Sequence, residues 1–226
     1  MSLNKKLINH LNEFIVNERK ELFEKKIQER TKHITIILEN IYQGRNISAS
    51  IRSADCFGVQ DVHIIENNNL FNQDPSVSIG SEKWISLYRY NQKKQNTKDT
   101  INKLKRDGYK IIVTTPHAKA KTLYDLNISN KNALLFGSEG DGCSEIALNM
   151  ADEKIKIPLY GFSESFNISV SVALCLQHLT YKLRKSKFNW KLTNKEKEKI
   201  MLQWLKKSIN SSNKIEELFI NNLKKK

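Results

Sequence analysis

The hydrophobic pattern of the chain changes from helical to strand-like near residue 33. From Leu3 to Ile27, apolar residues recur every three or four positions between Lys and Arg, which predicts an amphipathic helical arm. Six short runs rich in β-branched residues then predict strands at 34–41, 62–66, 84–88, 110–115, 133–137 and 154–157. Helical patterns separate most of these runs, at 47–57, 97–107, 144–150 and 164–182. Strands that alternate with helices predict an α/β domain with a mostly parallel sheet.

A second change follows Tyr181, where the composition becomes strongly basic. The segment KLRKSKFNWK leads to a helix that Thr193 can cap and that extends to about Ile209, and a shorter amphipathic piece ends the chain. We therefore divide the chain into a basic helical arm (1–32), a main domain (33–181) and a basic helical extension (182–226).

Net charge points to a polyanionic partner. Lys and Arg exceed Asp and Glu by 14 over the chain, with +3 in the arm, +1 in the main domain and +10 in the extension. In the helix at 193–209, an apolar face is formed by Ile200, Met201, Trp204 and Leu205. We expect this face to dock on the main domain or on a second subunit. Lys195, Lys199 and Lys206 lie on the opposite side, where they either contact the phosphates of such a partner or only keep the helix soluble.

Cysteine usage and hydropathy exclude several classes of protein. Cys56, Cys143 and Cys175 share no metal-ligand spacing, so we expect small, buried, reduced thiols in a cytoplasmic protein rather than a disulfide or a zinc site. No stretch approaches 18 apolar residues, and the first residues contain no apolar signal region. The sequence therefore predicts neither secretion nor a membrane span.

Two segments that follow strands are candidates for ligand contacts, because α/β domains bind ligands at strand ends. In NISASIR (46–52), Asn46 is placed to cap a helix, and Arg52 lies nearly two turns further on, where it is either a surface residue or a group aimed at a site. In GSEGDG (137–142), glycines allow backbone N–H groups to approach a ligand, although an ordinary turn would look the same. Its spacing matches neither a dinucleotide fingerprint nor a phosphate loop, which argues against a nicotinamide-dependent oxidoreductase.

A third candidate segment, residues 157–173, passes from a strand through a proline and a glycine into a helix. Ser163 or Ser165 can act as a plain N-cap there. Four polar residues alternate across the start of this helix: Ser165, Asn167, Ser169 and Ser171. We expect this helix to be otherwise buried, and a buried polar cluster needs hydrogen-bond partners, for which a ligand is a good candidate.

Taken together, the three segments resemble the three motifs of the SpoU/TrmH methyltransferases of the SPOUT superfamily, over roughly residues 30–182. The matching patterns are N-x-x-A-x-x-R-S-A, L-F-G-x-E-x-x-G-x-S and I-P-x-x-G-x-x-x-S-x-N-x-S-V-x-V-A. The resemblance implies an α/β domain with a C-terminal trefoil knot, one of the few exceptions to the absence of knots in proteins. It also implies S-adenosylmethionine (AdoMet) bound in the knot, and a homodimer with each site near the subunit interface.

The same resemblance implies the substrate and the residues of the site. The helical flanks resemble members that methylate the ribose 2′-hydroxyl of guanosine-18 in the D-loop of tRNA, whereas GSEGDG is closer to members that act on ribosomal RNA, which stays an alternative. The catalytic positions fall on Arg52, Asn46, Glu139, Ser165 and Asn167. The cofactor positions fall on Thr114, Gly137, Ile157, Leu159 and Phe166. This full set argues against a protein that only binds RNA.

The chemistry is consistent with these residue types. Methyl transfer from a sulfonium to a hydroxyl is an in-line displacement, so we expect no metal requirement. A guanidinium has a pKa above 12, which makes Arg52 a poor base. We expect Arg52 to orient the ribose or a phosphate and to stabilise the developing alkoxide, and to accept the proton only if its pKa is strongly lowered.

Overall fold

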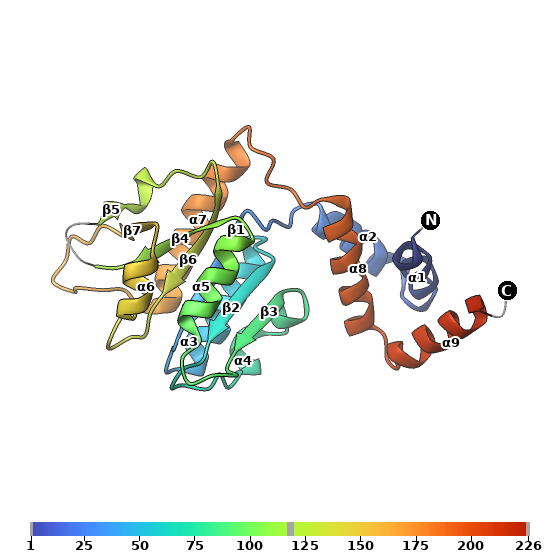
Figure 1. Ribbon diagram of the computed structural model, residues 1–226. Coiled ribbons are helices and arrows are strands. Elements are labelled where there is room, and N and C mark those ends of the chain that lie inside the picture. The colour runs from blue at the N-terminus through green and yellow to red at the C-terminus, as the bar shows by residue number, and fades with distance from the viewer. Residues whose placement is uncertain (1, 117–119, 225–226) are drawn as a thin grey trace. The chain divides into compact units, whose positions relative to one another are not determined.

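The chain folds into two compact units, which a computed structural model describes for residues 2–116 and 120–224. The larger unit is Thr31–Trp190 (Figure 1). The smaller unit is built from the two ends of the chain, up to Arg30 and from Lys191 onward. Each unit has its own set of packed elements.

A seven-stranded parallel sheet forms the centre of the larger unit, in the order β3-β2-β1-β6-β4-β7-β5. Its strands are β1 (Ile34–Glu39), β2 (Asp61–Ile65), β3 (Ser86–Tyr90), β4 (Tyr109–Thr114), β5 (Lys121–Thr122), β6 (Lys131–Phe136) and β7 (Glu153–Lys156). Every residue of β1 and β2 is buried, which explains their continuous apolar runs, because parallel strands are covered on both faces. The expected α/β domain with a parallel sheet is confirmed.

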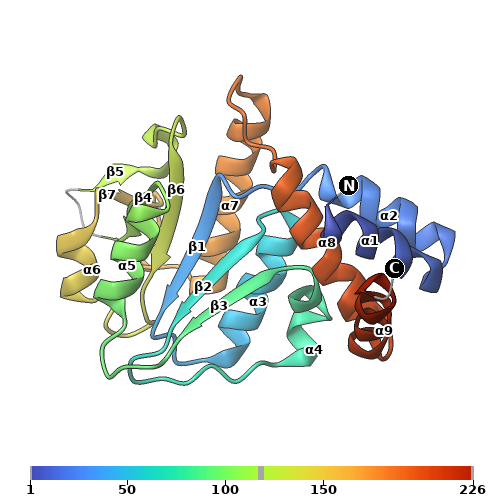
Figure 2. The same ribbon diagram turned by 45° about the vertical axis from the view of Figure 1, so that its right-hand side comes forward.

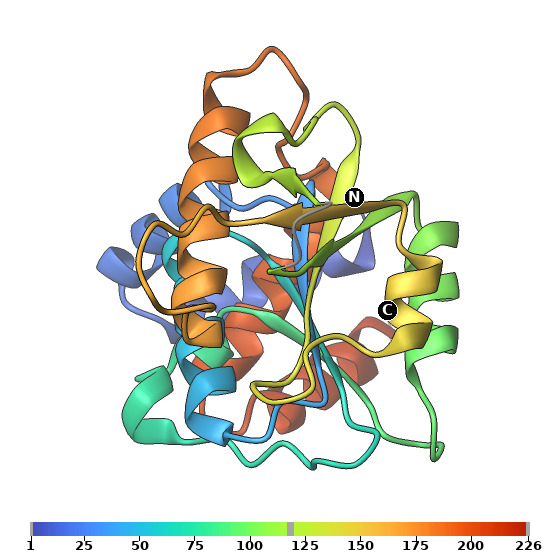
Figure 3. The same ribbon diagram turned by 90° about the vertical axis from the view of Figure 1, so that its left-hand side faces the viewer.

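Helices cover both faces of this sheet. Figure 3 shows α3 (Gly44–Cys56) and α7 (Ile168–Lys185) on one face, and α5 (Thr97–Arg106) and α6 (Glu145–Met150) on the other. One apolar core lies between the sheet and α3 and α7, and it includes Ile36, Ile51 and Val172. A smaller core on the other face includes Ile101 and Leu135. A short helix, α4 (Pro75–Ser78), and 3-10 turns at Ser81–Lys83 (η2) and Leu123–Asp125 (η3) lie in the connections.

The smaller unit is a group of helices drawn from both ends of the chain. It contains α1 (Leu3–Leu11), a 3-10 turn at Asn12–Phe14 (η1), α2 (Asn17–Ile27), α8 (Asn194–Ser208) and α9 (Ser212–Lys224). Figure 2 shows α8 beside α1 and α2, and the ring of Trp204 lies 5.4 Å from that of Phe23. The apolar face of α8 therefore packs on the N-terminal arm, and the expected docking on the main domain or a second subunit is wrong.

Several local expectations are corrected by the structure. The expected helical arm consists of two helices, α1 and α2, with the η1 turn between them. Asn46 does not cap a helix, because α3 already begins at Gly44. Cys175 is buried as expected and Cys143 is partly buried, but Cys56 is exposed. The expected cap of the last long helix is confirmed, since Thr193 and Glu196 form a reciprocal capping box at the start of α8. Among the helices of the described residues, none is long and apolar enough to cross a membrane.

Candidate active site

A cavity of about 400 Å³ opens beyond the carboxyl ends of β4 and β6. Its wall combines the end of β4, the glycine loop that follows β6 and the segment that enters α7. The lining residues include Thr114, Pro116, Phe136, Gly137, Ser138, Glu139, Cys143, Glu164, Ser165, Phe166, Asn167 and Ser171. A smaller hollow of about 90 Å³ shares Thr114, Ser165 and Phe166 and adds Ile157 and Leu159. All five residues expected at the cofactor therefore line one of these two adjoining spaces.

The glycine loop (137–142) is closed on itself by two backbone hydrogen bonds. Ser138 and Gly142 exchange them, at 3.0 and 3.1 Å. A Cβ atom on Gly137 would lie 2.1 Å from the backbone of Gly142, so only glycine permits this closure. Gly142 itself has a φ of 69°, which a side chain would strain. Because the loop closes in this way, its backbone forms a fixed wall of the cavity.

Three of the residues that the motifs single out form one hydrogen-bonded chain. The Asn46 amide donates from Nδ2 to Oε1 of Glu139 at 2.5 Å, and its Oδ1 accepts from Nδ2 of Asn167 at 3.1 Å. The other carboxylate oxygen of Glu139 accepts from the backbone N–H of Tyr42. Asn46 is itself buried. The three motifs, far apart in sequence, therefore meet at one edge of the cavity.

Asn167 also organises the start of α7. Its Oδ1 accepts from the backbone N–H and the hydroxyl of Ser169, at 2.8 and 2.6 Å, so Asn167 is the N-cap in place of the expected Ser163 or Ser165. Ser165 and Asn167 are exposed in the single chain rather than buried. The polar cluster therefore faces the open cavity.

Arg52 is the one expected catalytic residue that lies apart from the others. It is exposed on α3, and it does not line the cavity formed by the described residues. It lies six positions after Asn46, which corresponds to about 9 Å along a helix and about 120° around it. Within one subunit, the Arg52 guanidinium is therefore not part of the hydrogen-bonded series Asn46–Glu139–Asn167.

The sequence motifs did not single out Glu39, a buried carboxylate beneath the site. Glu39 ends β1 and accepts from the Thr97 hydroxyl at 2.6 Å, from the Ser144 hydroxyl at 2.7 Å and from the Ser144 backbone N–H at 2.9 Å. Ser144 is the N-cap of α6 and follows the glycine loop closely. An acidic residue at the end of an otherwise apolar strand, ITIILE, was the available signal.

Cys143 contributes a neutral thiol to the wall of the cavity. Burial, with a smaller effect of nearby Glu39, raises the pKa of Cys143 to about 12. Its Sγ donates weakly to the carbonyl oxygen of Thr114 at 3.4 Å. The thiol therefore stays protonated and has no nucleophilic character at neutral pH.

The three lysines expected to bind RNA lie on α8. Lys195 and Lys199 are exposed, whereas Lys206 is partly buried and pairs with Glu216 of α9 at 2.5 Å. The opposite face of α8 contributes Ile200, Trp204 and Leu205 to the interior of the smaller unit. The two exposed lysines are therefore the ones that remain available for a phosphate.

Comparison with known proteins places this geometry in a family. Residues 33–177 match the SpoU rRNA Methylase family. A tRNA (guanosine(18)-2'-O)-methyltransferase of Borreliella burgdorferi is 40% identical over 213 residues, which cover 94% of this chain and 96% of that protein. An enzyme of the same name from Thermus thermophilus is 29% identical over 191 residues, covering 84% and 96%.

A solved structure extends the likeness to the fold. The A. aeolicus TrmH/SpoU tRNA modifying enzyme aligns with a TM-score of 0.76 at 22% identity, over 86% of this chain and 98% of that one. At this level of identity, the likeness concerns the fold alone.

Proposed function

The chain belongs to the SpoU rRNA Methylase family, and we propose that it methylates the ribose 2′-hydroxyl of guanosine-18 in tRNA with AdoMet as donor. The observation that carries the substrate is the extent of the similarity to the Borreliella tRNA enzyme. It covers 94% of this chain and so includes helices that flank the residues of the family match. Ribosomal RNA is the competing substrate.

AdoMet fits the cavity on structural grounds. The closed glycine loop lines the cavity with Gly137, Gly140 and Gly142, which have no side chains, and Ile157, Leu159 and Phe166 supply apolar surface. Thr114 and Gly137 complete the proposed contacts. When bound there, AdoMet supplies an electrophilic methyl group. The loops on either side of this cavity are also where we place the trefoil knot, because α7 returns from the last strand to pack on α3, near the beginning of the domain.

The polar residues of the site have two different roles, placing the ribose and stabilising its alkoxide. The Asn46–Glu139–Asn167 chain fixes the edge of the cavity against which the ribose is placed, and Ser165 lies on the same edge. Proximity and alignment of the two reacting groups supply much of the rate of such a displacement. Arg52 orients the ribose or its phosphate and stabilises the alkoxide as the hydroxyl loses its proton.

A homodimer would complete this site. The exposed side of α7 and the segment before it carry apolar side chains that the larger unit leaves uncovered: Phe162, Phe166, Val170, Leu174 and Tyr181. Exposed apolar patches of this kind mark protein interfaces. Because α3 packs beside α7, two copies joined through this face can bring Arg52 of one subunit to the cavity of the other.

A methylation assay tests the proposal. Purified protein is incubated with methyl-labelled AdoMet and either tRNA transcripts or ribosomal RNA fragments, with and without EDTA, and the modified ribose is mapped. We expect label on guanosine-18 of tRNA, unchanged by EDTA, and none on a transcript with 2′-deoxyguanosine at that position. Methyl groups on a base, a preference for ribosomal RNA or loss of activity with EDTA would contradict it.

A further inference from the structure

A strongly basic segment lies within residues 33–181, a region that is near-neutral as a whole. Residues 93–110 contain seven Lys and Arg against two Asp, a net charge of +5 within a region (33–181) whose total is only +1. This segment comprises α5, the loop that precedes it and the start of β4. None of its residues lines the cavity described above. The basic charge therefore belongs to a different surface of the domain.

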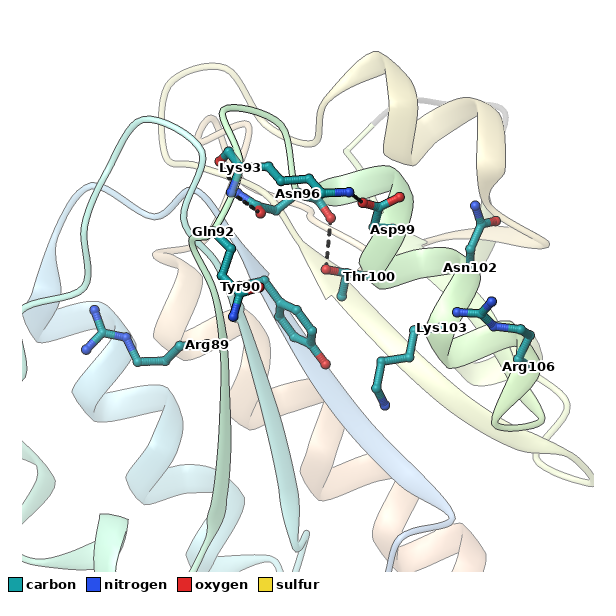
Figure 4. Close-up of a pocket in the computed structure, with 10 residues that line it drawn as sticks. All are labelled: Arg89, Tyr90, Gln92, Lys93, Asn96, Asp99, Thr100, Asn102, Lys103 and Arg106. Atoms are coloured by element: carbon teal, nitrogen blue, oxygen red, sulfur yellow. Dashed lines mark hydrogen bonds and ion pairs between the residues drawn. The ribbon is translucent and has the colours of Figure 1, made fainter.

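A groove of about 530 Å³ lies between this segment and β3. Figure 4 shows the Tyr90 ring projecting from β3 toward α5, where Lys103 and Arg106 lie, with Lys93 and Asn96 at one end. Asn96 holds the loop there, because its side chain bonds to the backbone N–H and carbonyl of Lys93. The groove thus has fixed walls and a volume in the range of small-ligand sites.

Aromatic rings continue from the groove along the same face of the sheet. The imidazole of His63 stacks on the ring of Tyr88 at 4.8 Å and on that of Tyr90 at 5.9 Å, and its Nδ1 is 2.9 Å from the Tyr90 hydroxyl. Both tyrosines are partly exposed. Figure 2 shows β2 and β3 with no helix of the larger unit over them on this side. These rings therefore form a platform open to a flat, stackable group.

The charged groups beside the platform suit an anion. Burial raises the pKa of Tyr90 to about 12 and lowers that of His63 to about 3, so both rings are uncharged at neutral pH. The ammonium of Lys103 lies 6.0 Å from the Tyr88 ring, and among the residues that the structure describes its ion-pair partner is exposed Asp107. Exposed pairs of this kind contribute little free energy, so a phosphate can compete for the lysine.

Two further cations complete the rim. Lys93 pairs with exposed Asp99, and Arg106 is exposed on α5 with no ion pair to another described residue. Arg89, by contrast, turns its guanidinium to Glu66 and takes no part. Rings flanked by lysine and arginine are the combination that binds unpaired nucleotides, by stacking and by phosphate contact.

We propose that the groove between β3 and α5 binds an unpaired nucleotide of the RNA substrate, with its base on Tyr88 and Tyr90 and its phosphates at Lys93, Lys103 and Arg106. This inference rests on the proposed function for the identity of the RNA. It assigns the basic segment of the larger unit a role separate from methyl transfer: holding part of the RNA away from the reacting ribose.

Paired charge variants provide the first test. We compare Lys103→Gln/Arg106→Gln with a control that removes the same charge from two lysines that do not line the groove, Lys110→Gln/Lys131→Gln. Binding of a fluorescent single-stranded octanucleotide is measured by anisotropy across a salt series, and KM and kcat are measured with tRNA. For two lost phosphate contacts, the slope of log affinity against log salt should flatten by about 1.4 relative to the control. KM should rise with kcat nearly unchanged.

Variants of the platform provide the second test. Tyr88→Leu/Tyr90→Leu should weaken the octanucleotide at least about fivefold through lost stacking, while its duplex form is bound as before. Tyr88→Phe/Tyr90→Phe keeps the rings and should bind normally, which separates stacking from folding defects. Groove variants that match the control in both arms would overturn the inference. If the wild-type protein methylates no tRNA, the proposed function fails, but the octanucleotide measurements still decide whether the groove binds RNA.

Discussion

At the scale of single residues, Arg52 is the group on which the proposed chemistry depends most. It is exposed and does not line the cavity of its own chain, so it contributes little to folding. Arg52→Ala should lower kcat at least about 100-fold, the low end for a positioned acid–base group, with AdoMet affinity unchanged by calorimetry. Arg52→Lys keeps the charge without the two-pronged guanidinium and should recover only part of the rate. Near-normal turnover of Arg52→Ala would remove it from the mechanism.

Glu39 represents the opposite case, a buried group that supports the site from beneath. Glu39→Ala leaves the Thr97 hydroxyl and both Ser144 donors without their acceptor and should cost about 2–3 kcal/mol of unfolding free energy in urea. AdoMet affinity should fall as well, because Ser144 holds the end of the glycine loop. The control, Glu145→Ala, removes an exposed carboxylate directly after Ser144. It should alter neither the free energy of unfolding nor the AdoMet affinity. Equal effects of the two variants would contradict the assignment.

His63 makes stability dependent on pH. Burial lowers its pKa to about 3 in the folded protein, whereas the unfolded chain takes up the proton near the ordinary value of 6.5. The unfolded state therefore binds more protons below pH 6.5, and stability falls as the pH drops from there toward 3. Between pH 7.5 and pH 5.5 the loss from this group should be about 1.4 kcal/mol.

Urea unfolding at the two pH values checks this prediction. The reference is His63→Leu, in which the same comparison should show a smaller loss by about that amount, whatever the absolute stability of the variant. If both proteins lose equally, the imidazole is not held neutral by the fold.

The residue positions of the site were predictable only where they belong to a motif. Asn46, Glu139 and Asn167 could be singled out because their patterns resemble a family, and the structure joins them by hydrogen bonds. The sequence could not show that these three side chains bond to one another, because the two hydrogen bonds join residues 93 and 121 positions apart. Glu39 and the Tyr88–His63–Tyr90 platform belong to no motif, and their meaning depends on which strands become neighbours.

At the scale of elements, most strands and helices of the larger unit were predictable because their periodicity is long enough to detect. The six expected strands are all present, although β3 begins two residues later than its apolar run. β5 has two residues and α4 has four, too few for any period, and both were missed. The predicted start of α3 was wrong because Asn46 is a residue type that often caps helices. In the structure, its side chain instead donates a hydrogen bond to Glu139.

The α8 helix carries a prediction about RNA affinity. Lys195 and Lys199 are exposed, whereas Lys206 is already paired with Glu216. Lys195→Gln/Lys199→Gln should flatten the slope of log tRNA affinity against log salt by about 1.4–1.8, similarly for every tRNA tested, because phosphate contacts carry no sequence information. Lys206→Gln serves as the control and should leave the slope unchanged. A double variant with the wild-type slope would return these lysines to a role in solubility.

At the scale of the whole molecule, the most consequential feature is that helices from the two chain ends pack together in one unit. Helices from residues 3–27 and 194–224 form one unit, with Phe23 packed on Trp204, so elements nearly 200 residues apart share an interior. Local periodicity shows that each helix has an apolar face, but it does not show which other element packs against that face. This is why α8 was expected to dock elsewhere. The same limit applies to the uncovered apolar side of α7.

The uncovered side of α7 and the isolated position of Arg52 lead to one prediction about assembly. If two copies pack through this face, Arg52 of one subunit serves the cavity of the other, and a twofold axis makes both sites alike. Arg52→Ala and Asn167→Ala should each be nearly inactive alone. When the two are unfolded together, mixed and refolded, heterodimers contain one site with both substitutions and one site with neither. Because about half of the dimers are heterodimers and each has one intact site of two, activity should return to roughly a quarter of the wild-type value.

The same mixture decides between the two arrangements of the site. If Arg52 acted within its own chain, each site of a heterodimer would carry one substitution, and mixing would restore nothing. The control is the pair Asn46→Ala and Asn167→Ala, which are hydrogen-bonded within one chain and should not complement each other. Recovery in the first pair without recovery in the second can arise only from a site shared between subunits. Failure of both, in a protein that light scattering shows to be dimeric, would assign Arg52 to the cavity of its own chain.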